Sequence, residues 1–264
     1  MQENKSAYYF HGVFIEKQSE SWYNKMIIDV NGFDFKTLNQ KIQQSDYNCQ
    51  ITGCCGQRFI GAGMKEKHIT INGIPGNALG AYLNGASIIV NSNAQDAVGD
   101  TMNEGSIIIH GNVGDAAGYA MRGGKILVKG NAGYRAGIHM KEYNNKVPLM
   151  IIGGSAGSFL GEYQAGGVII VLGINKSKDK IVGNFPCTGM HGGKVFLRGN
   201  IDNIIFPNNV CIKTADNEDL KSIEQDLNEY CSLFGYDISE ILNSQFTIIT
   251  PDSKNPYKQM YVAN

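Results

Sequence analysis

The stretch "HGNVGDAAGYAMRGGKILVKGNAGYRAGIHM", residues His110–Met140, contains nearly the same phrase twice. Asn112 and Asn131 lie 19 residues apart, and so do Gly118 and Gly137. A fixed period of roughly 20 residues or more is typical of solenoids, in which each repeat forms one turn of a coil. This stretch therefore predicts that the chain forms a solenoid.

Three kinds of position recur at this interval: a glycine, a Met or Leu three residues after it, and an asparagine six residues before it. The glycines are Gly61, Gly80, Gly99, Gly118, Gly137 and, after an insertion, Gly161; the Met/Leu positions are Met64, Leu83, Met102, Met121 and Met140; the asparagines are Asn93, Asn112 and Asn131. The insertion covers residues 141–148, and Cys187 takes the glycine position of the last unit. The apolar residues come in short β-branched runs, which indicates strands because no 3.6-residue period is present.

Nineteen extended residues trace roughly 60 Å, enough for one closed coil around a lumen filled by side chains. We therefore predict an all-β solenoid, a right-handed parallel β-helix of about seven coils, since parallel crossovers have that hand. The Met/Leu position is expected to point inward. The recurring glycine is expected at a sharp bend, with positive φ or no space for a Cβ. The asparagines are expected to form a ladder of amides, in a backbone conformation that tolerates the left-handed region.

The central residues of the strand-like triplets are apolar as well, and they share the opposite face of the predicted sheet. A sheet with water on one side would alternate apolar and polar residues, so this outer face is expected to be covered. Either the ends of the chain or a partner cover it, and we predict that a partner contributes. The candidate partner-docking residues are Ile89, Ile108, Leu127, Ile151, Ile170 and Phe196.

Both ends of the chain lack the period. Strand-like runs at 8–15 and 26–30 precede a helix expected near 34–44, and helices are expected at 217–232 and after Asp237. A solenoid needs its open ends covered, so these segments are expected to be caps. The predicted organisation is a small α/β N-terminal cap or extension at 1–54, the β-helix at 55–200, and a helical C-terminal cap or docking tail at 201–264.

Composition narrows the function classes. The chain has 33 glycines but only 6 prolines, and its formal charge is −1, from 23 basic and 24 acidic residues. This balance argues against nonspecific nucleic-acid binding and against electrostatic membrane attachment. No apolar run approaches the roughly 20 residues of a membrane span, and the first residues lack the layout of a secretory signal. We expect a cytoplasmic protein whose six cysteines are reduced and mostly buried.

The candidate chemical motifs are weak. "GNVGDAAG" looks like a phosphate-binding loop, but it recurs in series with no helix after it. His139 and His191 have no second ligand at metal-binding spacing. The acidic residues are scattered, except that Asp96 and Asp115 stack in one turn, which disfavours a polysaccharide-cleaving site. The sequence predicts no catalytic, cofactor-binding or metal-binding residue in this chain.

The phrases "GNALGAYLNGASIIV", "NAQDAVGDTMNEGSIIIHGNVGDAAGYAMRGGKILVKGNAGYRAGIHMKEY" and "GGSAGSFLGEYQAGGVIIVLG" resemble a known domain. They are similar to the glycine-rich repeat (GXGXG) domain at the C-terminal end of the glutamate synthase large subunit, and more closely to its free-standing subunit form. One of the subunits of formylmethanofuran dehydrogenase carries the same repeat. The resemblance covers about residues 26–200, and the "TGMHGGKVFLRGN" and "NPYKQMY" phrases also fit the free-standing form.

The resemblance implies a noncatalytic structural or docking subunit of a glutamate-synthase-like complex, which forms glutamate from glutamine and 2-oxoglutarate. Its partners would be a glutamine amidotransferase subunit and a synthase subunit with FMN and iron–sulfur clusters. No cofactor is expected in this chain, whose second residue is Gln2 where the amidotransferase has a catalytic cysteine. Three alternatives stay open: a scaffold subunit of a formylmethanofuran-dehydrogenase-like oxidoreductase, a self-associating β-helix that forms a homo-oligomer, and a polysaccharide-acting β-helix enzyme.

Overall fold

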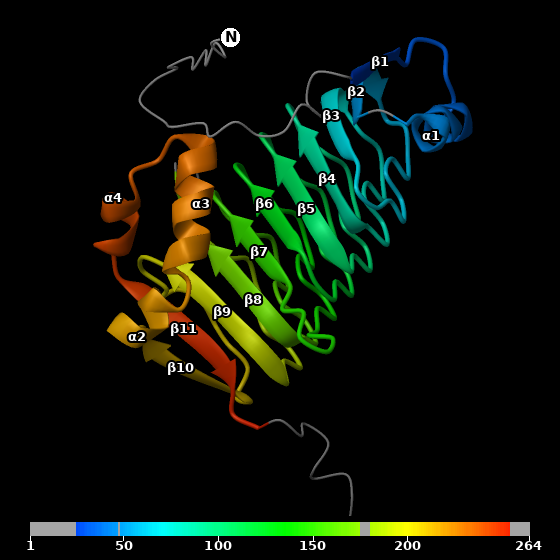
Figure 1. Cartoon of the computed structure of the whole chain (residues 1–264). Helices are drawn as coiled ribbons and strands as arrows, with labels where there is room; N and C mark the ends of the chain where they lie inside the picture. The colour runs from blue at the N-terminus through cyan, green and yellow to red at the C-terminus, as the bar shows by residue number, and fades with distance from the viewer. Residues whose placement is uncertain (1–24, 47, 175–179, 254–264) are drawn as a thin grey trace, which may run out of the picture.

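The computed structural model describes residues 25–46, 48–174 and 180–253. Its core is one continuous sheet of 11 strands, in which β1 to β9 follow one another in chain order and pair in parallel (Figure 1). The parallel strands are β1 Lys25–Asp29, β2 Asn48–Cys55, β3 His68–Ile74, β4 Asn84–Val90, β5 Glu104–Ile109, β6 Lys125–Val128, β7 Leu149–Ile152, β8 Ala165–Val171 and β9 Gly192–Arg198. The antiparallel strands β11 Phe246–Pro251 and β10 Val210–Thr214 complete the sheet.

The strand register confirms the 19-residue coil. Ile69 pairs with Ile88, Ile88 with Ile107, and Ile107 with Ile126, each step being 19 residues. The next step, from Ile126 to Met150, is 24 residues because the 141–148 insertion loops out without disturbing the sheet. The chain is therefore a parallel β-helix of about seven turns, as the repeat predicts. A second, shorter ladder of parallel bridges joins Ala94, Val113, Ala132, Ala156 and Val182 on another side of the coil.

The lumen of the β-helix is filled by the predicted inward columns. Four Met/Leu positions are fully buried and Met64 packs partly buried against the same core. The residue before each recurring glycine is also buried; these residues are Ile60, Leu79, Val98, Ala117, Ala136 and Leu160. Gln164 takes the next Met/Leu position and is fully buried, and its amide nitrogen donates to the carbonyls of Gly166 and Gly167 at 3.2 and 3.1 Å.

The recurring glycine is required for two reasons at once. From Gly61 to Gly161 its φ lies between +63° and +72°, a region that L-residues rarely enter. In addition, a Cβ on Gly99 would lie 2.5 Å from Cδ1 of Ile126. Cys187 keeps the same turn in the last coil, with φ of 59°, and burial raises the pKa of its thiol to about 12.

The asparagine ladder forms, but its backbone differs from the prediction. Asn93 Oδ1 accepts from the Asn112 amide and Asn112 Oδ1 from the Asn131 amide, both at 2.7 Å, and Asn131 Oδ1 accepts from the Ser155 amide at 2.8 Å. None of the three asparagines has positive φ. The left-handed residues lie instead around the recurring glycine, so each asparagine contributes only its side-chain acceptor.

We expect Asn112→Ala to lower the free energy of unfolding by about 1 kcal/mol, because the Asn131 amide loses its acceptor at a partly hydrated turn. Asn203→Ala, at an exposed loop position, is the matched control and should stay within about 0.5 kcal/mol of the wild type. Urea unfolding followed by circular dichroism measures both. Equal losses in the two variants would contradict a stabilising ladder.

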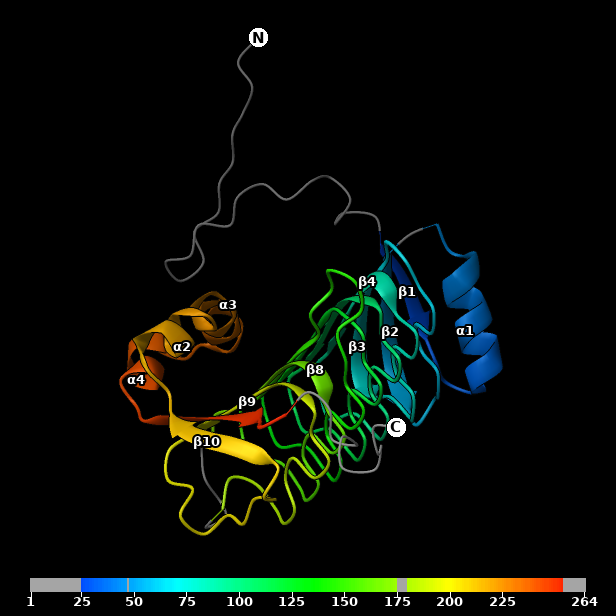
Figure 2. The same ribbon diagram turned by 90° about the horizontal axis from the view of Figure 1, so that it is seen from below.

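The N-terminal segment covers one end of the lumen. Helix α1, Phe35–Gln44, begins at Asp34, whose carboxylate accepts from the Thr37 amide at 2.7 Å. Its buried residues Leu38 and Ile42 belong to the lumen core, and Figure 2 shows the helix beside β1 and β2 at that end. The predicted strand at 26–30 is β1, and the sheet runs through the predicted 54/55 boundary; the run at 8–15 lies outside the described residues.

The C-terminal segment contains more than the predicted helices. The helix expected at 217–232 divides into α2, Asn217–Lys221, and α3, Glu224–Phe234, because the Ser222 hydroxyl bonds back to the Asp219 carbonyl. α3 ends at Gly235 with φ of 75°, and α4, Ile238–Leu242, follows. The strands β10 and β11, which the sequence pattern does not predict, return the chain to the sheet.

Candidate docking surface

The apolar outer face of the sheet is covered by the chain itself. A second core joins this face to Ile223, Leu227, Tyr230 and Phe234 of the α3 segment (Figure 1). Of the two covers that the sequence leaves open, the chain's own end accounts for most of this face: five of the six candidate docking residues are buried beneath the C-terminal helices and Ile89 packs partly buried at their margin. The six are Ile89, Ile108, Leu127, Ile151, Ile170 and Phe196.

Polar contacts hold α3 on the sheet. The buried Tyr230 hydroxyl donates to the Val128 carbonyl at 3.0 Å. Lys125 Nζ lies 2.9 Å from Asp226 Oδ1 and 2.6 Å from Glu229 Oε2. The sheet face becomes polar beyond α3, where Gln50 and Thr70 occupy the same row that is apolar beneath the helix. The row ends at Ile27 of β1, which pairs with Gln50 and is 64% exposed, so an apolar residue also lies beyond the covering segment.

His110 packs against the end of α3, with its ring 5.3 Å from that of Phe234. Burial, and then the charge of Lys129, lowers the pKa of His110. Because the pKa is lower in the folded state, the unfolded chain binds protons first, and stability is lost as pH falls through about 6.5.

We expect the wild type to lose more unfolding free energy between pH 8 and pH 5 than His110→Gln. Parallel losses in urea titrations would contradict this.

An exposed surface that the sequence pattern does not single out runs along the turns around the recurring glycines. We call it the aromatic ridge, and it is formed by Tyr119, Tyr134, His139, Phe159, Tyr163 and Phe185. Tyr134 and Phe185 are 53% and 58% exposed, although large apolar rings of a folded chain are usually covered. The ridge lies on four consecutive coils.

The rings of the ridge contact one another from coil to coil. His139 stacks on Tyr163 at 5.2 Å between centroids, with 9° between the planes, and meets Tyr119 edge to face at 5.9 Å. Phe159 and Phe185 form a second row, 5.3 Å apart. The solenoid thus sets aromatic side chains in rows whose spacing is fixed by the coils.

The turns around the recurring glycines have left-handed backbone throughout the solenoid. The second residue before and the second residue after each recurring glycine have positive φ in every coil, between +48° and +63° for residues other than glycine. Alanine occupies the first of these places in three consecutive coils, at Ala78, Ala97 and Ala116. Later coils place Arg135, Phe159 and Phe185 there. The turn does not need these large side chains, because alanine forms it in neighbouring coils.

Two stacked carboxylates adjoin the ridge. Asp96 Oδ1 accepts from the Asp115 amide and Asp115 Oδ1 from the Tyr134 amide, both at 2.8 Å. Asn77 and Ser158 make the same turn bond in this column without a charge. In the described part of the chain, no basic side chain pairs with either aspartate. The turn therefore does not require the negative charges of Asp96 and Asp115.

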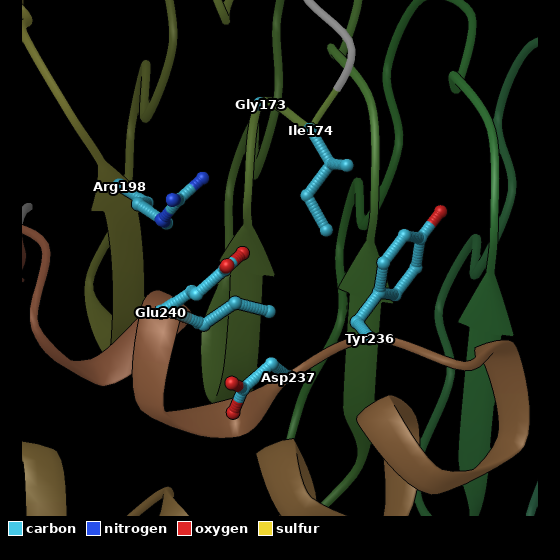
Figure 3. A pocket seen from close by; sticks show the side chains of 7 residues that line it. Gly173, Ile174, Arg198, Tyr236, Asp237 and Glu240 are labelled. Carbon is cyan, nitrogen blue, oxygen red and sulfur yellow. The ribbon is translucent and has the colours of Figure 1, made fainter.

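The described residues also line a small cavity of about 240 Å³ between the sheet and α4 (Figure 3). Arg198 extends from β9 toward this cavity and is hydrogen-bonded within the chain. Its Nε donates to the Ser244 hydroxyl at 3.0 Å and its Nη1 to the Leu172 carbonyl at 3.1 Å. Asp237 caps α4, and its hydrogen bonds from Ser239 lower the pKa of its carboxyl. The polar groups of this cavity attach α4 to the sheet.

Within residues 25–46, 48–174 and 180–253, no group of three or more His, Cys, Asp or Glu side chains has the geometry of a metal site. Among the same residues, no helix is long and apolar enough to cross a bilayer. Four of the six cysteines, Cys49, Cys54, Cys187 and Cys231, are buried, as predicted.

The fold and the ridge together define a glycine-repeat β-solenoid with an exposed aromatic face. The chain belongs to the GXGXG motif family, whose model matches residues 33–252. It is 43% identical over 251 residues to an uncharacterized protein of Methanocaldococcus jannaschii, covering 90% of this chain and 96% of that protein.

A solved structure has the same fold. It is the formyltransferase/hydrolase complex of Methylorubrum extorquens in complex with methylofuran, one chain of which aligns with a TM-score of 0.61 at 18% identity. The alignment covers 84% of this chain and 92% of that chain. The likeness concerns the fold, and it confirms the architecture that the repeat predicts.

The aromatic ridge has a signal in the sequence. Stacking the chain on its period places two residues of the ridge, His139 and Tyr163, in one column, two residues after the recurring glycine, together with Tyr82, which lies outside the ridge. The column also contains Thr101 and Ala120, so aromatic residues are concentrated in it rather than uniform. Positive φ in this column is the information that the sequence lacks, because without it an exposed tyrosine at a turn is ordinary.

Proposed function

We propose that the chain is a noncatalytic docking subunit of a multi-subunit enzyme and that the aromatic ridge is its docking surface. The observation that carries the proposal is the exposure of large rings at the turns of four consecutive coils, where alanine forms the same turn in neighbouring coils. Contiguous exposed apolar surface usually marks an interaction site, and aromatic residues are enriched at the centres of interfaces. The rigid solenoid would present these rings in a fixed arrangement.

We further propose that the enzyme is a glutamate-synthase-like complex in the cytoplasm. A glutamine amidotransferase subunit would release ammonia, and a synthase subunit with FMN and iron–sulfur clusters would use it to convert 2-oxoglutarate to glutamate. Membership of the GXGXG family supports the docking role. The second candidate is a scaffold subunit of a formylmethanofuran-type enzyme, supported by the fold shared with a chain of the formyltransferase/hydrolase complex.

Purification of the tagged chain from its native host tests the proposal. We expect amidotransferase and synthase subunits to co-purify, and the assembled complex to form glutamate from glutamine and 2-oxoglutarate. The chain alone is expected to show no turnover. Turnover by the isolated chain would contradict a noncatalytic role, whereas formyltransferase or hydrolase subunits in the complex would favour the second candidate.

A further inference from the structure

The aromatic ridge already binds one guanidinium group of its own chain. The Arg135 guanidinium carbon lies 5.0 Å over the Phe159 ring, and Arg135 Nε lies 3.0 Å from Glu162 Oε2. A ring face and a carboxylate thus bind this cation from two sides. Arginine is well suited to such a site because its planar, weakly hydrated group stacks on a ring while it donates to a carboxylate.

The adjoining part of the ridge also contains carboxylates and aromatic rings, and no basic side chain of the described residues pairs with these carboxylates. Asp115 lies in the same turn as Tyr119, and it contacts Tyr134 of the next coil through the backbone bond at 2.8 Å. Both tyrosines are exposed, at 40% and 53%. Asp96 stacks one coil below and adds a second charge.

The two carboxylates lie on successive coils, which are about 4.8 Å apart, and like charges at this spacing repel each other. Asn77 and Ser158 make the same turn bond without a charge, so the charges of the two aspartates do not stabilise the fold. A cation supplied from outside the chain would offset this repulsion.

We infer that this part of the ridge receives an arginine-bearing segment of the partner subunit, whose guanidinium groups stack on Tyr119 and Tyr134 and pair with Asp96 and Asp115. The inference rests on the proposed docking function and specifies the chemistry of the partner. Uncharged apolar contacts on Tyr163 and Phe185 would continue the same interface. The rings set the position of the segment, and the two aspartates select its charge.

A tetra-arginine peptide, blocked at both ends, probes this chemistry on the full chain. In NMR titrations we expect its amide shift changes to be concentrated at residues 96–101, 115–120 and 134–139. Tetra-lysine should bind several-fold more weakly because it lacks the planar group, and tetra-glutamate should not bind.

Asp96→Asn with Asp115→Asn keeps the side-chain oxygens that the turn needs, and should weaken the binding of tetra-arginine about tenfold or more. Asp202→Asn, an exposed acid on another loop, is the control.

The same variants are then tested in the tagged complex from the native host. The inference predicts that the double variant and Tyr119→Ala/Tyr134→Ala lose partner subunits that the wild type retains, whereas Tyr82→Ala, exposed outside the ridge, retains them. If the wild type and all variants retain the partners equally, the inference fails, whereas the role of a noncatalytic docking subunit stands. If the wild type assembles with no other subunit, the proposed function fails. Self-association that the double variant abolishes would identify a second copy as the occupant and contradict the inference.

Discussion

Gly105→Ala should be among the most destabilising single substitutions in this chain, lowering the free energy of unfolding by about 3 kcal/mol or more. Gly105 has φ of +100°, and a Cβ there would lie 2.1 Å from the carbonyl oxygen of Ala86 in the coil below. Backbone cannot move aside as a side-chain end can, so the coils must separate locally. Urea unfolding followed by circular dichroism measures the loss.

Gly235→Ala separates strain from steric clash. Gly235 also has positive φ, 75°, but a Cβ there meets nothing within 4 Å. We expect this variant to lose only about 1–2 kcal/mol, the conformational cost alone. If Gly105→Ala is no more destabilising than Gly235→Ala, the close stacking of the coils is contradicted.

Leu227→Ala should lower the free energy of unfolding by about 2–5 kcal/mol, the usual range for deleting a buried leucine side chain. Leu227 is fully buried in the core between α3 and the outer face of the sheet. Weakening this contact should also expose the apolar strands beneath the helix. Binding of a hydrophobic dye in the native buffer therefore accompanies the loss of stability.

Leu233→Ala is the matched control on the same helix. Leu233 is 41% exposed, so we expect a change within about 0.5 kcal/mol and no dye binding. Should both leucine variants behave alike, α3 would not be the segment that covers this face, and a partner would again be the better explanation.

The repeat predicts the lumen well because one side-chain column has one environment. Met102, Met121 and Met140 recur at a fixed interval, and the stacking of equal coils gives each the same buried position. The outer face is harder to interpret. Its apolar residues indicate that the sheet is covered, but they do not indicate which segment covers it. The apolar stripe through Ile223 and Leu227 is recognisable in the sequence, whereas its position on the sheet is a property of the tertiary structure.

The asparagine column shows where local preference is misleading. Asparagine tolerates the left-handed region, but its side-chain acceptor here satisfies an amide of the next coil and needs no such backbone. The turn places positive φ at non-glycine residues such as Phe159 and Tyr163. This is opposite to their intrinsic preference, so a prediction based on preference misses the ridge. The candidate site is identified by the exposure of its rings in the folded chain.

Hydroxyl-radical footprinting of the free chain and of the assembled complex tests the docking role of the ridge most directly. We predict that oxidation of Tyr119, Tyr134 and Phe185 falls several-fold on assembly. Tyr82 and Tyr143, 58% and 55% exposed and outside the ridge, should be oxidised to the same extent in both samples. Unchanged oxidation of the ridge residues in a complex that contains its enzyme subunits would contradict the account.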